Sequence, residues 1–310
     1  MITKNKIFVQ KLFFSLLLLS CLFLPYINAS GSGTTAAQFL KLSVGARADA
    51  LGESFVGLSD DINSIYWNPA GLVNIENFQM ILNYAMLYEN IYYGFLGFSK
   101  NLSLIRGSVG ASVLYLGMDK IKGYDNYGNP LPDGDYTADD SSVGLSYAQS
   151  LTKKISVGIT FKSIEQKIEK EKATGFAVDI AGLYKPSDEF SFGLNLQNLG
   201  SKIGFYEKFD LPTNIKFGFG YHPKENVVIV SDINIPFDYT PSLHAGIEYV
   251  YRDILALRFG LKTKTMADLG VISGLSCGIG IKIEKINFDY AFLPYGELGM
   301  THRISILIKL

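Results

Sequence analysis

Cysteine, histidine and tryptophan are rare in this sequence, with two, three and one among 310 residues. Only Cys277 lies beyond the first 29 residues, so the rest of the chain can form neither an internal disulfide nor a thiolate metal cluster. No histidine has metal-ligand spacing to a cysteine or a carboxylate; the three are His222, His244 and His302. We therefore expect no metal centre and no cofactor.

Long apolar runs and an excess of basic charge are also missing. After residue 29 no apolar stretch reaches the roughly 20 residues that a membrane-spanning helix needs, so only strands could cross a membrane. The formal net charge is −1, and residues 1–29 hold three lysines and no acid. Without them Lys plus Arg falls from 28 to 25 against 29 acidic residues, which gives −4. No basic patch stands out, so nucleic acid is not an expected partner.

The first 29 residues have the layout of a secretory signal peptide. Lysines precede an apolar run over residues 12–24, Pro25 ends the run, and residues 27–29 offer a small-residue cleavage site. The apolar run has 13 residues, which is short for a spanning helix. An N-terminal anchor helix is one alternative. Lipoprotein processing at Cys21 is another, although the apolar run continues past that cysteine.

From Gln79 to the last residue the chain alternates apolar and polar residues in segments of about ten, most clearly over 155–161 and 190–196. Successive side chains of a strand point to opposite faces, so each segment has one apolar and one small or polar face. An even number of segments without a leftover helix predicts an all-β fold, a transmembrane antiparallel β-barrel of about 14 strands. The predicted strands are 78–87, 91–99, 104–118, 139–149, 155–166, 174–184, 189–197, 213–221, 227–235, 242–251, 254–264, 274–283, 286–293 and 302–309.

The two faces of these strands differ as they would in a membrane. A charge at mid-membrane on the lipid face costs about 2–4 kcal/mol, so lipid enforces a purely apolar outer face. The alternative is a water-soluble sandwich with one wet face. The second face mixes glycines with charges of both signs, as a hydrated and partly filled lumen would. Its residues include Lys162, Asp179, Lys216, Asp232, Glu248, Arg258, Lys262, Lys282, Asp289 and Arg303, with Gly158, Gly193, Gly218, Gly260 and Gly280 among them.

Residues 30–77 differ from the rest, because they are rich in Ala, Gly, Asp and Asn and show no period of two. Residues 46–51 could form a short helix, and Ser59 could cap a second helical turn with its hydroxyl. The stretch 68–71 looks like a third helix start, with asparagine as the cap and proline where no amide is needed. We expect a compact, mostly helical plug over 30–77, followed by the barrel over 78–310.

The connections between predicted strands alternate in length. Those after even-numbered strands are short, such as 150–154 and 252–253, whereas those after odd-numbered strands are mostly longer, up to 119–138. Bacterial outer-membrane barrels have short periplasmic turns and longer outer loops. The even-numbered connections would therefore face the periplasm together with the plug. The first outer connection, residues 88–90, is short and breaks the pattern.

Two segments carry a resemblance to a known family. The stretches Gly-Ala-Arg-Ala-Asp-Ala-Leu-Gly at 45–52 and Tyr-Trp-Asn-Pro-Ala-Gly-Leu at 66–72 resemble the N-terminal signature of the PorV/PorQ family of outer-membrane proteins. That family is similar to long-chain fatty-acid transporters of the FadL type, in which an N-terminal hatch with an Asn-Pro-Ala motif plugs a fourteen-strand barrel. The resemblance implies an outer-membrane location. It also implies a hatch motif, either architectural or gating, formed by Asn68, Pro69, Ala70 and Gly71.

No pattern in the chain indicates an enzyme. Residues 274–278 match a hydrolase nucleophile elbow literally, but that elbow needs a strand, a sharp turn and a helix, whereas these residues continue as a strand. Ser276 is therefore interpreted as a strand residue. The longest loop holds an acidic cluster that could suit calcium, although a solvated acidic loop is the favoured interpretation; its members are Asp133, Asp135, Asp139 and Asp140.

Two functions remain open. The first is an uptake channel for hydrophobic or amphipathic small molecules, for which Phe39, Leu40 and Tyr115 are candidate ligand-path residues pointing inward. The second, implied by the resemblance to PorV-like proteins, is a non-enzymatic accessory of protein secretion or surface attachment, with outer loops 119–138 and 198–212 binding a secreted protein partner. An apolar pocket in the lumen favours the first function and a filled lumen favours the second. Outer-membrane lipid is the expected surrounding in both.

Overall fold

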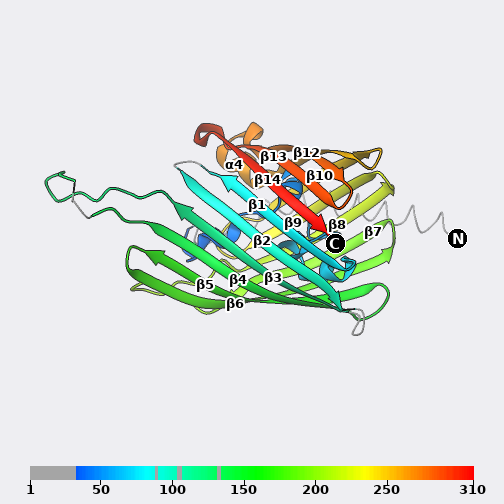
Figure 1. Ribbon diagram of the computed structural model, residues 1–310, viewed down its shortest axis with the longest axis horizontal. Helices are drawn as coiled ribbons and strands as arrows, with labels where there is room; N and C mark the ends of the chain where they lie inside the picture. The colour runs from blue at the N-terminus through cyan, green and yellow to red at the C-terminus, as the bar shows by residue number, and fades with distance from the viewer. Residues whose placement is uncertain (1–32, 88–89, 103–106, 131–133) are drawn as a thin grey trace.

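The fourteen predicted strands form one closed antiparallel barrel (Figure 1). The computed structural model describes residues 33–87, 90–102, 107–130 and 134–310, so the predicted signal peptide lies outside the described residues. Because the sheet is single and closed, the alternative of a two-sheet sandwich is wrong. The strands are β1 (Phe78–Met86), β2 (Ile91–Leu102), β3 (Gly107–Met118), β4 (Ala138–Ser150), β5 (Ile155–Ile168), β6 (Glu171–Ser187), β7 (Phe190–Gly200), β8 (Asn214–Lys224), β9 (Val227–Pro236), β10 (Ser242–Tyr251), β11 (Leu255–Lys262), β12 (Leu275–Ile283), β13 (Ile286–Pro294) and β14 (Met300–Lys309).

The first and last strands close the barrel. β1 pairs with β14 so that Gln79 lies opposite Lys309 and Met86 lies opposite His302. The amide of Leu310 donates to the carbonyl of Phe78 at 2.9 Å, which continues the ladder to the last residue. Every strand therefore has two neighbours, and the sheet has no free edge to template aggregation.

The barrel wall is apolar outside and polar inside. On β5, Ile159 and Phe161 face outward with 47% and 48% of their surface exposed, whereas the alternate residues Thr160 and Lys162 are buried. Eight of the ten charged residues that the sequence placed on the second face are buried; Lys262 is half-buried and Lys282 is exposed. This arrangement is the reverse of a water-soluble barrel, which would bury its apolar face.

The N-terminal segment, residues 33–77, lies inside the barrel, where Figure 1 draws it in blue. It holds η2 (Gln38–Lys41), α2 (Ala46–Ala50), α3 (Ser64–Trp67) and η3 (Pro69–Asn74), joined by turns, so helix makes up less of it than the sequence predicted. The prediction of a cap at Ser59 is wrong. The Ser59 hydroxyl donates to the carbonyls of Phe55 and Val56 and caps no helix, because it sits in a tight turn with a φ of 40°.

The N-terminal segment supplies much of the molecule's hydrophobic core. Phe39, Leu51, Phe55 and Trp67 are buried against inward-facing wall residues such as Tyr93. Burying a large apolar side chain contributes about 1.5–3 kcal/mol, so this packing holds the segment against the wall. None of the helices in the described ranges combines the length and the apolar character that a helical membrane span requires.

The two ends of the barrel differ. The connections after β4, β6, β8, β10 and β12 are tight turns, and the two chain ends of the barrel meet at the same end, since Phe78 and Leu310 are hydrogen-bonded. The opposite end, on the left in Figure 1, carries the longer connections and is called the loop end below. It includes the long β3–β4 connection, α4 (Thr263–Leu269) with η5 (Val271–Gly274) between β11 and β12, and η6 (Gly296–Leu298) between β13 and β14.

The apolar outer face leads to a first prediction. Replacing Ile159 by arginine should lower the free energy of unfolding from lipid vesicles by about 2–4 kcal/mol, because the charge would face the hydrocarbon. The control is Thr174→Arg on the neighbouring strand β6, which faces outward opposite Glu165, beyond the apolar run, and should cost about 0–1 kcal/mol. Urea titration with tryptophan fluorescence measures both variants, and equal losses would contradict a lipid-facing surface.

Candidate functional site

The turn at residues 68–71 joins the N-terminal segment to the wall. Asn68 is fully buried, and its Oδ1 accepts a hydrogen bond from the amide of Ala70 at 3.1 Å, which caps η3. Its Nδ2 donates to the carbonyl of Val56 at 2.9 Å and to the carbonyl of Gly182 on β6 at 3.1 Å. Pro69 begins η3, as the sequence predicted. Asn68 therefore follows the end of α3 with its backbone, while its side chain caps η3 and contacts the wall.

The rest of this turn packs tightly. Ala70 is buried against Ala181 and Leu183 of β6. A Cβ at Gly71 would lie 2.6 Å from the Ser59 carbonyl oxygen, so no larger residue fits there without a shift. The four predicted hatch residues are thus brought together at one contact with the wall, where η3 lies against β4, β5 and β6.

Glycines of the lumen face let the N-terminal backbone lie directly on the strands. A Cβ at Gly193 would collide with the Val56 carbonyl oxygen, and one at Gly218 would collide with the Gly57 amide. A Cβ at Gly158 would likewise meet the backbone of Ala70. The sequence pattern attributed these glycines to a hydrated lumen, whereas the structure uses them for close contact between backbones.

An ion-pair network fixes the N-terminal segment toward the turn end. The Arg47 guanidinium on α2 donates to Glu248 of β10 at 2.7 Å and 2.9 Å, and also to Asp60 and Asp61. Glu248 in turn accepts from Arg258 of β11 at 2.5 Å. Charged hydrogen bonds contribute about 1.5–3 kcal/mol each, and removing one partner of a buried pair costs more than the pair itself stabilises. Arg47 is therefore the electrostatic link between segment and wall.

A second ion pair lies nearer the loop end. Glu53 of the N-terminal segment accepts from the Lys262 ammonium at 2.5 Å. Burial by itself would raise the pKa of the Glu53 carboxyl, but the positive charges of Lys262 and His244 outweigh it and lower the pKa to about 2. Glu53 therefore stays ionised at neutral pH. The attraction contributes stability above the ordinary pKa of 4.5, and this contribution is lost as the pH falls toward 2.

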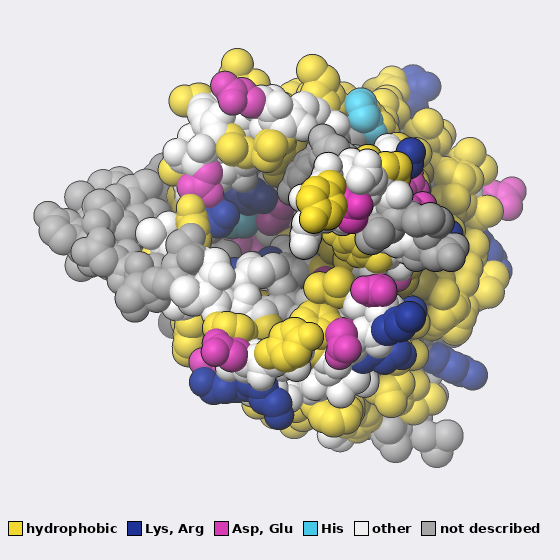
Figure 2. Space-filling view, turned by 90° about the vertical axis from the view of Figure 1, so that its left-hand side faces the viewer, with side chains coloured by type: hydrophobic (Ala, Val, Ile, Leu, Met, Phe, Trp, Pro, Cys, Tyr) yellow, Lys and Arg dark blue, Asp and Glu magenta, His cyan; other side chains and the backbone are white. Residues whose placement is uncertain are grey.

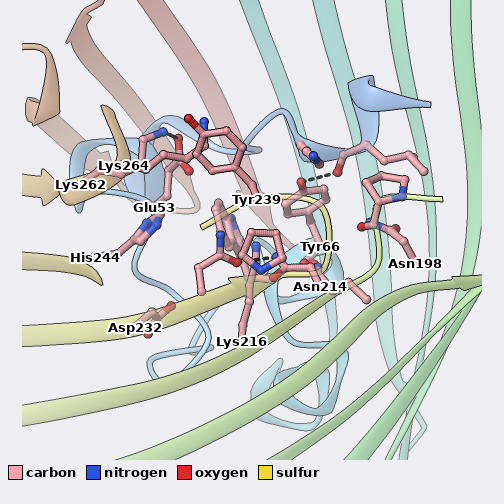
Figure 3. A pocket seen from close by; sticks show the side chains of 17 residues that line it. Glu53, Tyr66, Asn198, Asn214, Lys216, Asp232, Tyr239, His244, Lys262 and Lys264 are labelled. Atoms are coloured by element: carbon pink, nitrogen blue, oxygen red, sulfur yellow. Dashed lines mark hydrogen bonds and ion pairs between the residues drawn. The ribbon is translucent and has the colours of Figure 1, made fainter. Parts of the chain in front are cut away.

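A polar cavity opens between the N-terminal segment and strands β8–β11 at the loop end. Its volume is about 140 Å³. Figure 2 looks onto this end and shows a hollow with basic and acidic side chains inside it. Figure 3 shows the lining side chains, among which Lys216 extends from β8 toward the middle of the cavity. The lining includes four lysines, one histidine and two acids: Lys41, Lys216, Lys262, Lys264, His244, Glu53 and Asp232.

Aromatic rings and amides complete this loop-end cavity. The Lys216 ammonium lies 4.3 Å from the centre of the Trp67 ring and 5.8 Å from that of Tyr66. Trp67 is held in place because its indole N–H donates to the Val44 carbonyl at 2.8 Å. The backbone carbonyl of Trp67 accepts from the Asn195 side chain of β7 at 2.7 Å. The cavity can therefore contact apolar, aromatic and charged parts of a ligand at once.

A second cavity, of about 250 Å³, opens near the turn end. It is lined by Arg47, Asp60 and Asp61 of the N-terminal segment and by the wall residues Glu248 and Asp289. Residues of the N-terminal segment line both cavities, so the segment lies between them. No group of three or more metal-ligating residues occurs among the residues that the structure describes.

The predicted ligand-path residues lie in different places. Phe39 is buried in the core, and Leu40 is buried and lines the loop-end cavity. Tyr115 does not point inward as expected. Its side chain is 38% exposed on the outer face of β3, where it stacks on Tyr92 and donates to Asp139 at 2.7 Å. Of the acidic loop cluster, Asp133 lies outside the described residues.

Two parts of the site had no signal in the sequence pattern. Arg47 falls within the motif at 45–52, but nothing in the chain indicates Glu248 as its partner. Lys216 was predicted to face the lumen, but its contact with Trp67 depends on how the N-terminal segment lies in the barrel. The carbonyl oxygens that accept from the Asn68 side chain belong to Val56 and Gly182, which are likewise remote from Asn68 in the sequence.

A family model described as the type IX secretion system protein PorV matches residues 28–235 of the chain. None of the curated proteins compared with the chain matches it. The matched range covers the N-terminal segment and the barrel through most of β9.

Solved structures of hydrocarbon channels have a similar fold. The toluene transporter TodX of Pseudomonas putida has a TM-score of 0.61 and 13% identity, over 86% of this chain and 97% of that chain. The monoaromatic hydrocarbon channel CymD has a TM-score of 0.63 and 10% identity, over 86% and 98% of the two chains. A FadL homologue of Pseudomonas aeruginosa has a TM-score of 0.56 and 10% identity, over 91% and 99%. Identities this low establish a common fold alone.

The close contact at the wall glycines leads to a second prediction. Gly193→Ala should displace the N-terminal segment, because the added methyl group would collide with the Val56 carbonyl. Trypsin should then cut after Arg47, which the native barrel wall encloses, and mass spectrometry would detect the fragment. The control is Gly94→Ala, where the added carbon meets nothing within 4 Å and Arg47 should stay protected. Equal protection in both variants would contradict the contact.

Proposed function

This chain belongs to the PorV family, and we propose that it is an outer-membrane channel for the uptake of hydrophobic or amphipathic small molecules, gated by residues 33–77. The observation that carries the proposal is the position of the N-terminal segment between two cavities that open toward opposite ends of the barrel. The FadL-like fold of the barrel supports the same function.

The outer surface of the barrel supports an outer-membrane location. The strands expose Ile, Leu, Val, Phe and Tyr side chains on their outward faces around the barrel, including Leu82, Leu145, Phe176, Phe217 and Phe259. Soluble monomers rarely expose apolar patches larger than a few hundred Å², whereas lipid favours such a surface. A secretory signal over residues 1–29 would bring the chain to that membrane.

The contacts of the N-terminal segment suit a gate. Polar links at Arg47, Glu53 and Asn68 hold the segment to the wall, and such links can break and re-form when water or a ligand replaces one partner. The apolar contacts of Phe55 and Trp67 favour the closed arrangement. In this proposal a molecule enters the loop-end cavity, the segment shifts, and the molecule leaves toward the turn end.

Deletion of residues 33–77 tests the gate. The variant should show raised single-channel conductance in planar bilayers, because the lumen would lose the segment that fills it. Arg47→Ala, which removes the ion pairs with Glu248, Asp60 and Asp61 and leaves the rest of the segment in place, should give a smaller rise through brief openings. Different mobility of boiled and unboiled samples on gels confirms that each barrel is folded. Unchanged conductance in a folded deletion variant would refute the gate.

The family match favours a second candidate function, a non-transporting accessory of protein secretion or surface attachment. The β3–β4 connection extends well beyond the barrel rim (Figure 1). Antiparallel bridges pair Ile121 with Tyr136 and Tyr124 with Pro130, so the connection is an extended arm. Tyr127 near its tip is 91% exposed, and tyrosine is enriched at the energetic centres of protein interfaces. The arm is therefore the first place to look for a secreted protein partner.

The accessory function predicts that the arm can be disabled without affecting the lumen. The double variant Tyr124→Ser/Tyr127→Ser should lose copurifying secreted protein and keep the conductance of the native barrel. Leu151→Ser, an exposed change at the opposite end, should retain the partner. Quantitative mass spectrometry of the detergent-extracted complex measures both. Unchanged recovery from the double variant would exclude the arm as the docking element.

A further inference from the structure

One lysine of the loop-end cavity forms no ion pair with any described residue, although acidic side chains lie nearby. Lys216 is buried, and among the described residues no hydrogen bond or ion pair reaches its ammonium group, whose contacts are the Trp67 and Tyr66 rings. Each of the other three lysines forms an ion pair, as Lys41 with Asp238, Lys262 with Glu53, and Lys264 with Asp268. Lys216 is therefore the one cation of this lining that is free to bind an anion.

The nearby acid does not take this role. Asp232 of the neighbouring strand uses its Oδ2 to accept from the amides of Phe55 and Val56, both at 2.8 Å, and its Oδ1 forms no hydrogen bond or ion pair with the Lys216 ammonium. His244 also has its ring nitrogens engaged, with Nδ1 2.7 Å from the Gly52 carbonyl oxygen and Nε2 3.0 Å from the Ser242 hydroxyl. A buried ammonium without hydrogen bonds is costly, and an anion in the cavity would offset that cost.

We propose that the loop-end cavity binds a small molecule carrying a single carboxylate, with the Lys216 ammonium as its counter-ion. This inference deepens the proposed uptake function and rests on it for the fate of the ligand. One unpaired ammonium matches one negative charge, which favours a monocarboxylate over a multiply charged phosphate ester. The side-chain amides of Asn198, Asn214 and Gln197 lie in the same lining. Each already donates one N–H within the protein, and the second N–H of such an amide can hydrogen-bond the other carboxylate oxygen.

The size and the walls of the cavity define the rest of the ligand. A volume of about 140 Å³ compares with the roughly 150 Å³ of an engineered cavity that accommodates benzene, so a few carbon atoms fit and an extended long chain does not. Leu40, Pro212 and Pro236 supply apolar surface beside the Trp67 ring. The ligand class is therefore a short-chain or single-ring carboxylate, bound by its charge and by one compact apolar group.

Trp67 makes this proposal directly measurable, because it is the single tryptophan of the chain and contacts Lys216. Butyrate serves as the probe, 1-butanol as its uncharged counterpart and inorganic phosphate as the alternative oxyanion. Butyrate should change the Trp67 emission saturably, whereas 1-butanol should not and phosphate should bind more weakly. Calorimetry on the full detergent-extracted barrel gives the affinity independently of the fluorophore.

Lys216→Met should weaken butyrate binding at least about tenfold, and Lys216→Arg should largely retain it. Lys309→Met removes a lysine from the turn-end cavity and should leave the affinity unchanged. Gel mobility before and after boiling checks that each variant is folded. The proposal is overturned if butyrate fails to bind, if 1-butanol or phosphate binds equally well, or if Lys216→Met binds like the native barrel.

This outcome is separable from that of the channel proposal. Butyrate binding in a barrel whose conductance does not rise on deletion of residues 33–77 would keep the carboxylate site and remove the gated channel. Raised conductance of the deletion variant without butyrate binding to the native barrel would keep the gated channel and remove the carboxylate site.

Discussion

Charge pairing inside a closed wall is the constraint on which the rest of the structure depends. Lipid on the outside leaves the inward face as the only place for charged side chains, and a lumen filled with protein offers them little water. Pairing therefore stabilises these charges, and Arg47 and Glu53 of the N-terminal segment supply partners to Glu248 and Lys262 of the wall. The segment and the wall are thus stabilised by each other, and neither has a satisfied interior alone.

The strands of the wall could be predicted well from the sequence, because the pattern that defines each strand lies within the strand itself. A strand with lipid on one side must alternate, so strand positions came within about three residues of the structure and the lumen face was identified correctly for residues such as Lys162 and Arg303. Alternation fails where both faces are apolar. Leu114, Tyr115 and Leu116 at the end of β3 carry no such signal, and there Tyr115 was assigned to the wrong face.

The site was predicted less completely, because it is made by contacts between remote segments. Asn68 and Pro69 were identifiable, since capping depends on neighbouring residues only. The role of Gly193 could not be predicted from the sequence. A glycine on a strand face gives the same sequence pattern whether water or the Val56 backbone lies above it. The predicted helix cap at Ser59 was wrong for a related reason. Its hydroxyl found nearby carbonyls in a turn that tertiary packing imposes.

The chemistry of the lumen separates this chain from what its fold alone would suggest. Its fold is shared with hydrocarbon channels at 10–13% identity, a level that carries over the architecture and leaves the lining free to change. A hydrocarbon has no charge or hydrogen-bond acceptor that could offset the cost of burying an ammonium group. Lys216 would therefore not help a channel to bind such ligands. Burial of the same lysine beside Trp67 becomes favourable once an anion occupies the cavity. In this proposal one side chain of the lining determines the ligand class, and the surrounding barrel keeps the common architecture.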